Sequence, residues 1–227
     1  GRGQLRDVVE RLAQVAGPDA VTSADGSGQT SLHIAARYGH AVVVTAVLGS
    51  APQHVSALGA ALDAKALAPG DVAAASGHEA VIDALLAANA SSLEALHWAA
   101  YNGHLGVLLR VLRPQSDAAS VQEMLLRRDR RMSATPLHFA VGGSQASAAL
   151  RLLRDDAASQ DLKRKMLEAA DSFGRTPLDL ARQKGMAALA ESLEAELSAA
   201  ADEASSDGSG SCSAAAPDSD RGTSEAA

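Results

Sequence analysis

The feature that most constrains this chain is a short phrase that recurs along it. "TSLHIAARYGH" at residues 30–40 and "EALHWAAYNGH" at 94–104 share a Leu-His pair, an Ala-Ala pair and a final Gly-His. Related segments follow, so that the copies start near residues 30, 68, 94, 135 and 176. Steps of this size indicate a stacked array, because one such unit cannot bury its own apolar face.

Each copy has residue types that start and stop a short helix. Threonine suits the N-cap, because its hydroxyl accepts a backbone N–H that has no partner within the helix, and proline suits the first helical position. Glycine after the last turn predicts a left-handed stop. The residues concerned are Thr30, Thr135 and Thr176 at the cap, Pro69, Pro136 and Pro177 after it, and Gly39, Gly77, Gly103 and Gly185 at the stop. The fourth copy has Ser144 at the stop instead.

The third helical position holds either histidine or aspartate. Histidine occurs in three copies, as His33, His97 and His138, and aspartate in the other two, as Asp71 and Asp179. A carboxylate at this position faces the positive end of the helix dipole.

A second helix and a preceding turn complete the predicted unit. Apolar pairs four residues apart, such as Val43 with Val47 and Val44 with Leu48, give the second helix one apolar stripe. An aspartate five residues before three of the starts indicates a tight turn, at Asp25, Asp63 and Asp171. The step of 26 residues after the second copy is too short for a full hairpin, whereas two steps of 41 leave room for an extra helix near 122–129 and 163–171.

This order of turn, short helix, stop and second helix resembles the ankyrin repeat family. "DGSGQTSLHIAARYGH" and "DSFGRTPLDLARQKG" match the family pattern from turn to stop. The resemblance implies an all-α solenoid of stacked helix-turn-helix units with short hairpin turns, forming one domain over about residues 3–197. We expect residues 4–15 to form a capping helix. Residues 201–227 are acidic and have no Leu, Ile, Val or aromatic residue, so we expect them to be a disordered tail.

Composition indicates the cellular compartment and limits the classes of partner. The net charge is -7, but the tail carries most of it, so the repeat region is nearly neutral. The single cysteine, Cys212, excludes an internal disulfide framework and favours a reducing, intracellular environment. No apolar run reaches the ~18 residues of a membrane helix. We therefore expect a monomer in the cytoplasm, with the nucleus as an alternative, and no membrane partner.

The residues that can carry chemistry do not form a catalytic or metal-binding pattern. The three histidines at the third helical position and three more after the stops, His40, His78 and His104, recur once per repeat. Neighbours one repeat apart lie about 10 Å from each other, too far to share one ion. Cys212 has no nearby histidine. We expect no catalytic residue, metal or cofactor, and interpret Trp98 as core because Ile34 and Phe139 occupy its position in other copies.

The basic run "RRDRR" at 127–131 has two interpretations. A nucleic-acid site would need a wider basic field and stacking aromatic residues, neither of which is evident in this sequence. The favoured interpretation is a solvated turn in which Asp129 is paired locally, and no nucleic-acid partner is expected.

The resemblance also indicates a binding surface. Ankyrin repeats typically bind through the turn tips and the exposed face of the first helices, and those positions here include five basic residues and no acidic one. The partner-binding candidates are Arg37, Tyr38, Lys65, Tyr101, Asn102, Arg131, Met132, Phe173, Arg175, Gln183 and Lys184. We expect an acidic, partly apolar protein segment as the partner. The acidic tail is an alternative occupant of the same face.

The expected function is a non-catalytic protein–protein interaction module, a scaffold or adaptor. The alternative is the regulatory part of a larger enzyme, such as a kinase, an acyltransferase or a ubiquitin ligase, because ankyrin arrays often have that role. The first residue is Gly1 and not Met, which is consistent with a fragment or a processed product.

Overall fold

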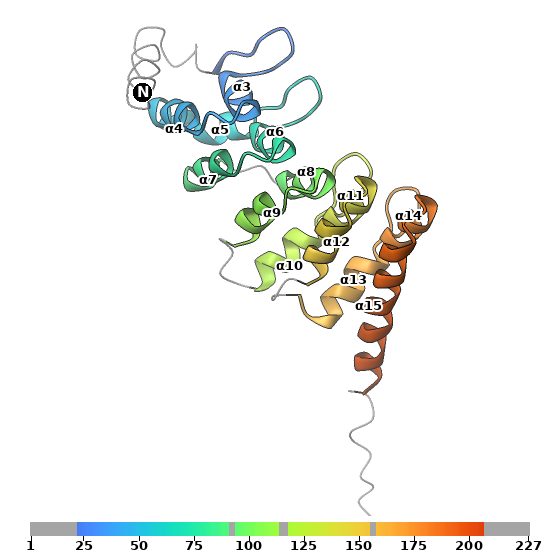
Figure 1. The fold of residues 1–227 in the computed structure, drawn as a ribbon. Helices are drawn as coiled ribbons and strands as arrows, with labels where there is room; N and C mark the ends of the chain where they lie inside the picture. The colour runs from blue at the N-terminus through green and yellow to red at the C-terminus, as the bar shows by residue number, and fades with distance from the viewer. Residues whose placement is uncertain (1–21, 91–93, 114–117, 155–157, 207–227) are drawn as a thin grey trace, which may run out of the picture.

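The computed structural model describes residues 22–90, 94–113, 118–154 and 158–206, and the elements in these ranges are helices without a strand (Figure 1). Two layers of helices run along the stack. The first layer consists of α3 (Ser31–Arg37), α6 (Pro69–Ser76), α8 (Ala95–Asn102), α11 (Pro136–Gly142) and α14 (Pro177–Gln183). The second layer consists of α4 (Ala41–Ser50), α7 (Glu79–Ala87), α9 (Leu105–Leu112), α12 (Ala146–Leu153) and α15 (Ala187–Ser206). This architecture confirms the predicted all-α solenoid.

Additional short helices lie between the repeat pairs. They are η1 (Pro52–His54), α5 (Val55–Ala60), α10 (Ala118–Leu126) and α13 (Gln160–Glu168). The last two confirm the extra helices predicted from the long steps, although both begin earlier and end before the aspartate that follows them. Sequence analysis missed η1 and α5. The predicted capping helix at 4–15 lies outside the described residues.

The core is built mainly from alanine and branched aliphatic side chains. Ala-Ala pairs of the first layer are almost fully buried, with Ala73, Ala74, Ala99 and Ala100 each 0% exposed. The predicted stripe on α4 also packs inward, with Val44, Val47 and Leu48 buried. Small side chains at the centre let neighbouring helices approach closely, which replaces the space filling that aromatic rings give in other cores.

Thr30, Thr135 and Thr176 occupy the predicted N-caps, but of these three only the Thr176 hydroxyl accepts the predicted backbone N–H, that of Asp179 at 3.2 Å. The backbone N–H of Thr30 donates to Nδ1 of His33 at 3.2 Å, and the Thr30 hydroxyl lies 2.9 Å from the same nitrogen. Thr135 and His138 repeat this pair at 3.2 and 2.8 Å. Because Nδ1 accepts a backbone N–H, the ring proton is on Nε2. Thr176 instead uses Asp179, whose Oδ2 accepts its N–H at 2.9 Å.

The histidines of these caps also join one repeat to the next. Nε2 of His33 donates to the Leu67 carbonyl at 3.0 Å, and Nε2 of His138 donates to the Arg175 carbonyl at 3.0 Å. Both acceptors are the last residues of the hairpin in front of the next first-layer helix. His97 similarly reaches the Arg127 carbonyl at 3.0 Å. Each histidine of this type therefore precedes a repeat that has a hairpin.

Aspartate takes this position where the described residues contain no hairpin in the following unit. After Asp71 the next first-layer helix is α8, and only residues 91–93, outside the described ones, separate Ala90 from Glu94. After Asp179 comes α15, which ends the described stack. Oδ2 of Asp71 accepts the N–H of Ala68 at 2.8 Å, so the cap is kept without a donor directed toward a neighbouring repeat.

The hairpins are organised by the aspartates identified in the sequence. Oδ1 of Asp25 accepts the N–H groups of Ser27 and Gln29, both at 2.8 Å, and Asp63 and Asp171 accept the equivalent pairs. Asp129 does the same in a turn that is longer by one residue, accepting from Ala134 at 2.7 Å, and is only 6% exposed. The residue interpreted as locally paired is therefore a buried turn organiser.

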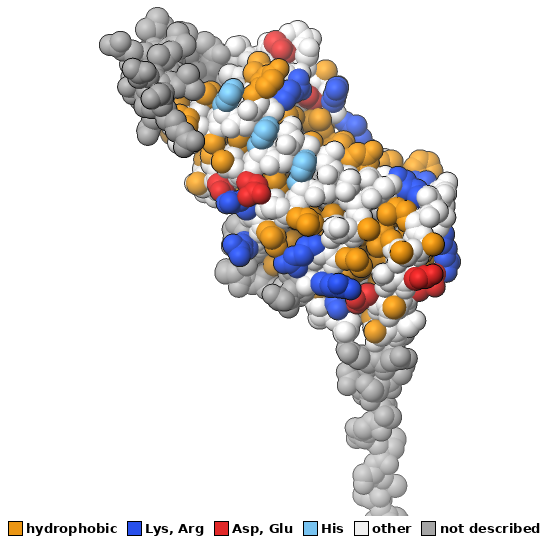
Figure 2. Space-filling model, viewed as in Figure 1, with side chains coloured by type: hydrophobic (Ala, Val, Ile, Leu, Met, Phe, Trp, Pro, Cys, Tyr) orange, Lys and Arg blue, Asp and Glu red, His pale blue; other side chains and the backbone are white. Residues whose placement is uncertain are grey.

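A second ladder joins the ends of the first-layer helices. Nε2 of His78 donates to the Arg37 carbonyl at 2.9 Å, and Nε2 of His104 donates to the Ala75 carbonyl at 3.1 Å. Each ring lies against the stop glycine of the preceding repeat, Gly39 or Gly77, which have φ values of 74° and 75°. Figure 2 shows histidine side chains in a row along this surface of the stack.

The final helix, α15, continues to Ser206 and so enters the segment 201–227 that was predicted to be a disordered tail. Residues 207–227, including Cys212, lie outside the described residues. No single described helix is both long and apolar enough to cross a membrane. Ala41–Ser50 and Pro52–Ala60 meet the length and composition test only as a pair, and the chain bends by 99° between them.

Candidate protein-interaction face

The predicted binding residues lie in two rows on the first-layer side of the stack. The hairpins carry Lys65, Arg131, Met132, Phe173 and Arg175, and the C-terminal ends of the first-layer helices carry Arg37, Tyr38, Tyr101, Asn102, Gln183 and Lys184. All of them are exposed except Arg175, which is partly buried. We refer to these two rows as the hairpin face.

The structure brings four of the predicted residues around one hollow. Tyr101, Met132, Arg175 and Lys184 line a depression of about 220 Å³, together with His138, Phe139 and Leu180. These side chains come from three successive repeats, α8, α11 and α14, and from the two hairpins between them. We call this depression the aromatic hollow. Its wall is mainly apolar and two cations lie at its edge.

Other predicted residues are not part of the hollow. Arg37 and Tyr38 lie at the end of α3, on the first repeat, where the Tyr38 ring stacks on His40 with 6.3 Å between centroids. The Asn102 amide donates to the Trp98 carbonyl of its own helix at 3.0 Å. Gln183 is exposed and does not line the hollow. A partner that contacts all predicted residues must therefore be extended along the stack.

The interpretation of Trp98 as core is only partly correct. Its side chain is half-buried, and its ring makes edge contacts with Tyr101 and Phe139, with centroids 6.1 and 5.8 Å apart. Ile34, at the equivalent position of α3, is 43% exposed, whereas Phe139 is 9% exposed. This helix position thus faces the hairpin side, and the hairpin that covers it determines its exposure. The apolar residue type alone does not predict how exposed the side chain is.

The basic side chains of the hairpin face have few acidic partners. Arg175 pairs with Asp171 at 2.7 Å and lies 4.8 Å from the centre of the Phe173 ring. For Arg37, Lys65, Arg131 and Lys184, no carboxylate partner is seen among the described residues. The Arg131 guanidinium instead donates to the Lys65 carbonyl, and the Lys184 ammonium to the Gly142 carbonyl. Unpaired cations raise the local positive potential and attract acidic ligands.

Hydrogen bonds on this face stabilise the ionised carboxylate of Asp171. Burial by itself would raise the pKa of the Asp171 carboxyl, but hydrogen bonds from the Arg175 side chain and from the backbone of Arg175 and Phe173 lower it overall. Oδ1 accepts the two backbone N–H groups, at 2.8 and 3.0 Å, while Oδ2 accepts the guanidinium. One turn aspartate can therefore organise its own hairpin and bind an arginine at once.

The run at 127–131 forms separate local contacts and not one basic field. Arg127 pairs with Glu123 at 3.6 Å and Arg130 with Glu94 at 3.5 Å. The Arg128 guanidinium donates to the carbonyls of Ser133 and Ala170 at 3.1 and 2.6 Å. These contacts favour the local interpretation of the run over nucleic-acid binding.

The described part of the chain offers no cluster of three or more His, Cys, Asp or Glu side chains that could hold a metal ion. Burial lowers the pKa of His97 and of His138, opposed by their hydrogen bonds to Arg127 and Arg175. Both rings are therefore predominantly neutral at pH 7, in agreement with their role as Nε2–H donors between repeats.

The ankyrin repeat family model matches residues 27–57, from the tip of the first hairpin through α3 and α4. No curated protein sequence matches the chain. The described helices after residue 57 repeat the same pairing of a short first-layer and a second-layer helix. The chain thus contains an ankyrin repeat within a run of paired helices consistent with several such repeats, and ankyrin repeats are generally protein-interaction modules, typically without catalytic activity.

Proposed function

We propose that this protein is a scaffold or adaptor, a monomer of the cytoplasm or nucleus, that binds an acidic, partly apolar segment of a partner protein on its hairpin face. The observation that carries the proposal is the coincidence of unpaired cations with exposed aromatic side chains on one side of the stack. Tyr38 and Phe173 are 65% and 69% exposed, and Tyr101 and Met132 are 44% and 40% exposed.

The distribution of exposed apolar side chains supports this face over the opposite one. Among the described residues, the large hydrophobic side chains that are clearly exposed are Ile34, Tyr38, Leu62, Tyr101, Leu105, Met132 and Phe173. Five of these belong to the hairpins or the first-layer helices. Aromatic and methionine side chains are enriched in protein interfaces, and clusters of them on a monomer indicate a binding surface.

Charge complementarity supports an acidic partner. Acidic side chains of the second-layer helices are engaged with cations there, as Glu79 and Asp83 are with Arg110. The cations of the hairpin face lack such partners. Each exposed ion pair with a partner would contribute only ~0.2–1 kcal/mol, so the aromatic hollow must supply much of the affinity and the cations much of the selectivity.

The test is affinity capture from cell extract with three forms of the full chain. The first is wild type, the second carries Tyr101→Ala and Lys184→Glu in the aromatic hollow, and the third carries Arg154→Glu at the end of α12 in the second layer. The last variant reverses a charge on an exposed residue far from the hairpins and serves as the control.

We expect a protein that is retained by wild type and the control and lost by the hollow variant, with weaker capture at high salt because exposed charges are screened. Equal capture by all three forms would place the binding surface elsewhere. Circular dichroism of the three forms checks that each variant is folded.

A further inference from the structure

Neighbouring hairpins in this stack are joined by one backbone hydrogen bond. The residue after the turn aspartate donates to the hairpin in front of it: the N–H of Ala64 to the Ser27 carbonyl at 2.9 Å, and the N–H of Ser172 to the Met132 carbonyl at 2.8 Å. These bonds define one donor position and one acceptor position on each hairpin.

The third repeat interrupts this series. No hairpin precedes α8 among the described residues, so the hairpins at 63–67 and 129–134 face each other across a gap. The acceptor on one side of the gap is the Lys65 carbonyl, which receives the Arg131 guanidinium in place of a backbone N–H. The donor on the other side is the Arg130 N–H, for which no partner is seen among the described residues.

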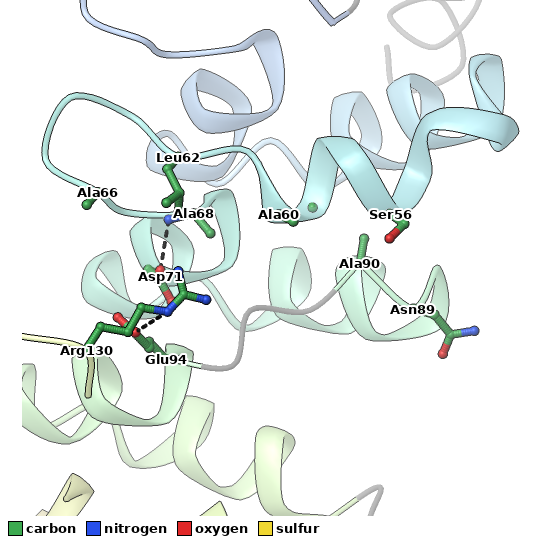
Figure 3. Close-up of a pocket in the computed structure, with 11 residues that line it drawn as sticks. Ser56, Ala60, Leu62, Ala66, Ala68, Asp71, Asn89, Ala90, Glu94 and Arg130 are labelled. Carbon is green, nitrogen blue, oxygen red and sulfur yellow. Dashed lines mark hydrogen bonds and ion pairs between the residues drawn. The ribbon is translucent and has the colours of Figure 1, made fainter. Parts of the chain in front are cut away.

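Two hollows adjoin the gap. One, of about 340 Å³, is lined by Lys65, Ala66, Leu67, Trp98 and Arg131. The other, of about 190 Å³, has Leu62, Ala66, Ala68, Glu94 and Arg130 in one part and extends to Ser56 and Ala60 of α5 and to Asn89 and Ala90 after α7 (Figure 3). We call the space between the two hairpins the interhairpin slot.

The chemistry of the slot favours an acidic ligand. Lys65 and Arg131 are exposed cations at its rim and have no carboxylate partner among the described residues. The half-buried Trp98 ring lies at its base and offers an apolar and aromatic contact. The arginine that occupies the Lys65 carbonyl is a flexible side chain, so a ligand N–H can replace it there while the guanidinium turns to a carboxylate.

Two other hairpins of the stack show a backbone shape that can form such bonds. In each, an aspartate accepts two backbone N–H groups, and the glycine three residues later lies in the left-handed region, Gly28 with a φ of 71° and Gly174 with a φ of 74°. The hairpins that flank the gap place Ala66 and Ser133 in this region, with φ values of 56° and 51°. Asp171 further shows that the second carboxylate oxygen of such a turn stays available to an arginine.

We propose that the interhairpin slot binds an acidic Asp-x-x-Gly turn of a partner protein, which takes the position that a hairpin holds in the neighbouring repeats. The turn donates a backbone N–H to the Lys65 carbonyl, accepts the Arg130 N–H, and places its aspartate against the Arg131 guanidinium. This inference rests on the proposed function, because it specifies one site and one ligand shape within the hairpin face.

The slot contains its own reporter, because Trp98 is the single tryptophan of the chain. The probe is a cyclic peptide with the sequence Ala-Asp-Gly-Ser-Gly-Gln, that of residues 24–29, and the control peptide has asparagine in place of its aspartate. Each is titrated into the full chain while Trp98 fluorescence is recorded. NMR shifts of the Lys65, Ala66 and Arg130 amides locate the bound peptide.

We expect a saturable fluorescence change with the aspartate peptide and the largest amide shifts at the slot. Affinity should fall roughly tenfold with the asparagine peptide and with Arg131→Glu, because each removes the charge-assisted contact, and should be unchanged in Arg154→Glu. No saturable response, or equal affinity for both peptides and both arginine forms, overturns the proposal.

Further outcomes separate this proposal from the proposed function. Capture of a partner that depends on Tyr101 and Lys184 but not on Arg131, with no peptide binding, overturns the slot and leaves the proposed function intact. Loss of both capture and peptide binding overturns both. Arg131-dependent self-association in sedimentation overturns the partner assignment, since a second copy would then supply the Asp-Gly-Ser-Gly of residues 207–210.

Discussion

Replacing Gly77 with alanine tests whether the histidine ladder holds neighbouring repeats together. Gly77 has a φ of 75°, and a Cβ built on it would lie 2.7 Å from Nδ1 and 2.8 Å from Cε1 of His104. The His104 ring must therefore move, and it would lose its 3.1 Å hydrogen bond to the Ala75 carbonyl. The substitution combines a backbone effect with the loss of a contact between repeats.

The two parts can be estimated separately. Left-handed backbone costs an alanine ~1–2 kcal/mol, offset by ~0.4–1 kcal/mol because alanine restricts the unfolded chain. Losing the histidine hydrogen bond costs a further ~0.5–1.5 kcal/mol. The expected decrease in the free energy of unfolding is thus about 2 kcal/mol. Gly185→Ala supplies the backbone effect alone, since Gly185 has a φ of 71° and no atom within 4 Å of the added Cβ.

Urea unfolding of the full chain, followed by circular dichroism, measures both variants. We expect Gly185→Ala to cost ~0.5–1 kcal/mol, clearly less than Gly77→Ala. In the His104→Ala background, Gly77→Ala should cost about as much as Gly185→Ala, because the ring it displaces is gone. Equal costs for the two glycines in the wild-type background, or additive effects of Gly77→Ala and His104→Ala, would refute the role of the ladder.

Three further predictions follow from the caps, the stops and the buried histidines. Glu94→Thr should stabilise the protein by ~1 kcal/mol, because Nδ1 of His97 is buried without a described hydrogen-bond partner. In the equivalent caps, Thr30 and Thr135 supply such a partner to His33 and His138. An unchanged urea midpoint would contradict this prediction. Ser144→Gly should stabilise by ~0.5–1 kcal/mol, because Ser144 has a φ of 59°, and a lower midpoint would argue against it. The free energy of unfolding should fall as the pH drops below ~6.5, because burial lowers the pKa of His97 and His138 and the unfolded chain takes up these protons first. Urea titrations at pH 7, 6 and 5 check this, and a flat profile would exclude it.

The parts of the fold that depend on local chemistry could be predicted from the sequence. Helix starts after Thr30 and Thr135, stops at Gly77 and Gly103, and turns at Asp25 and Asp171 each involve residues within five positions of one another, and the structure confirms them. The two long steps also predicted α10 and α13. The helix α5 was missed because "VSALGA" has little polar contrast, and its place depends on Gly59 lying against Ala90.

The candidate site was less accessible to sequence analysis because its contacts cross repeats. The residue types at the hairpin tips could be identified, but the bond from Arg131 to Lys65 joins positions 66 residues apart. The partial exposure of Trp98 depends on which residues of neighbouring repeats cover it, which is a property of the stack and not of the helix. The sequence signal was the short step of 26 residues, which predicts too little room for a full hairpin and says nothing of a ligand in its place.

The choice between histidine and aspartate at the third helical position constrains the order of the repeats. A histidine there carries a proton that must reach a carbonyl in the following unit, and an aspartate carries none. Exchanging the second and third units would leave a buried N–H facing no acceptor at one junction and a hairpin carbonyl facing a carboxylate at the other. Units of this protein are therefore not interchangeable modules. A duplicated or deleted unit would be tolerated only where this single residue agrees with its new neighbour.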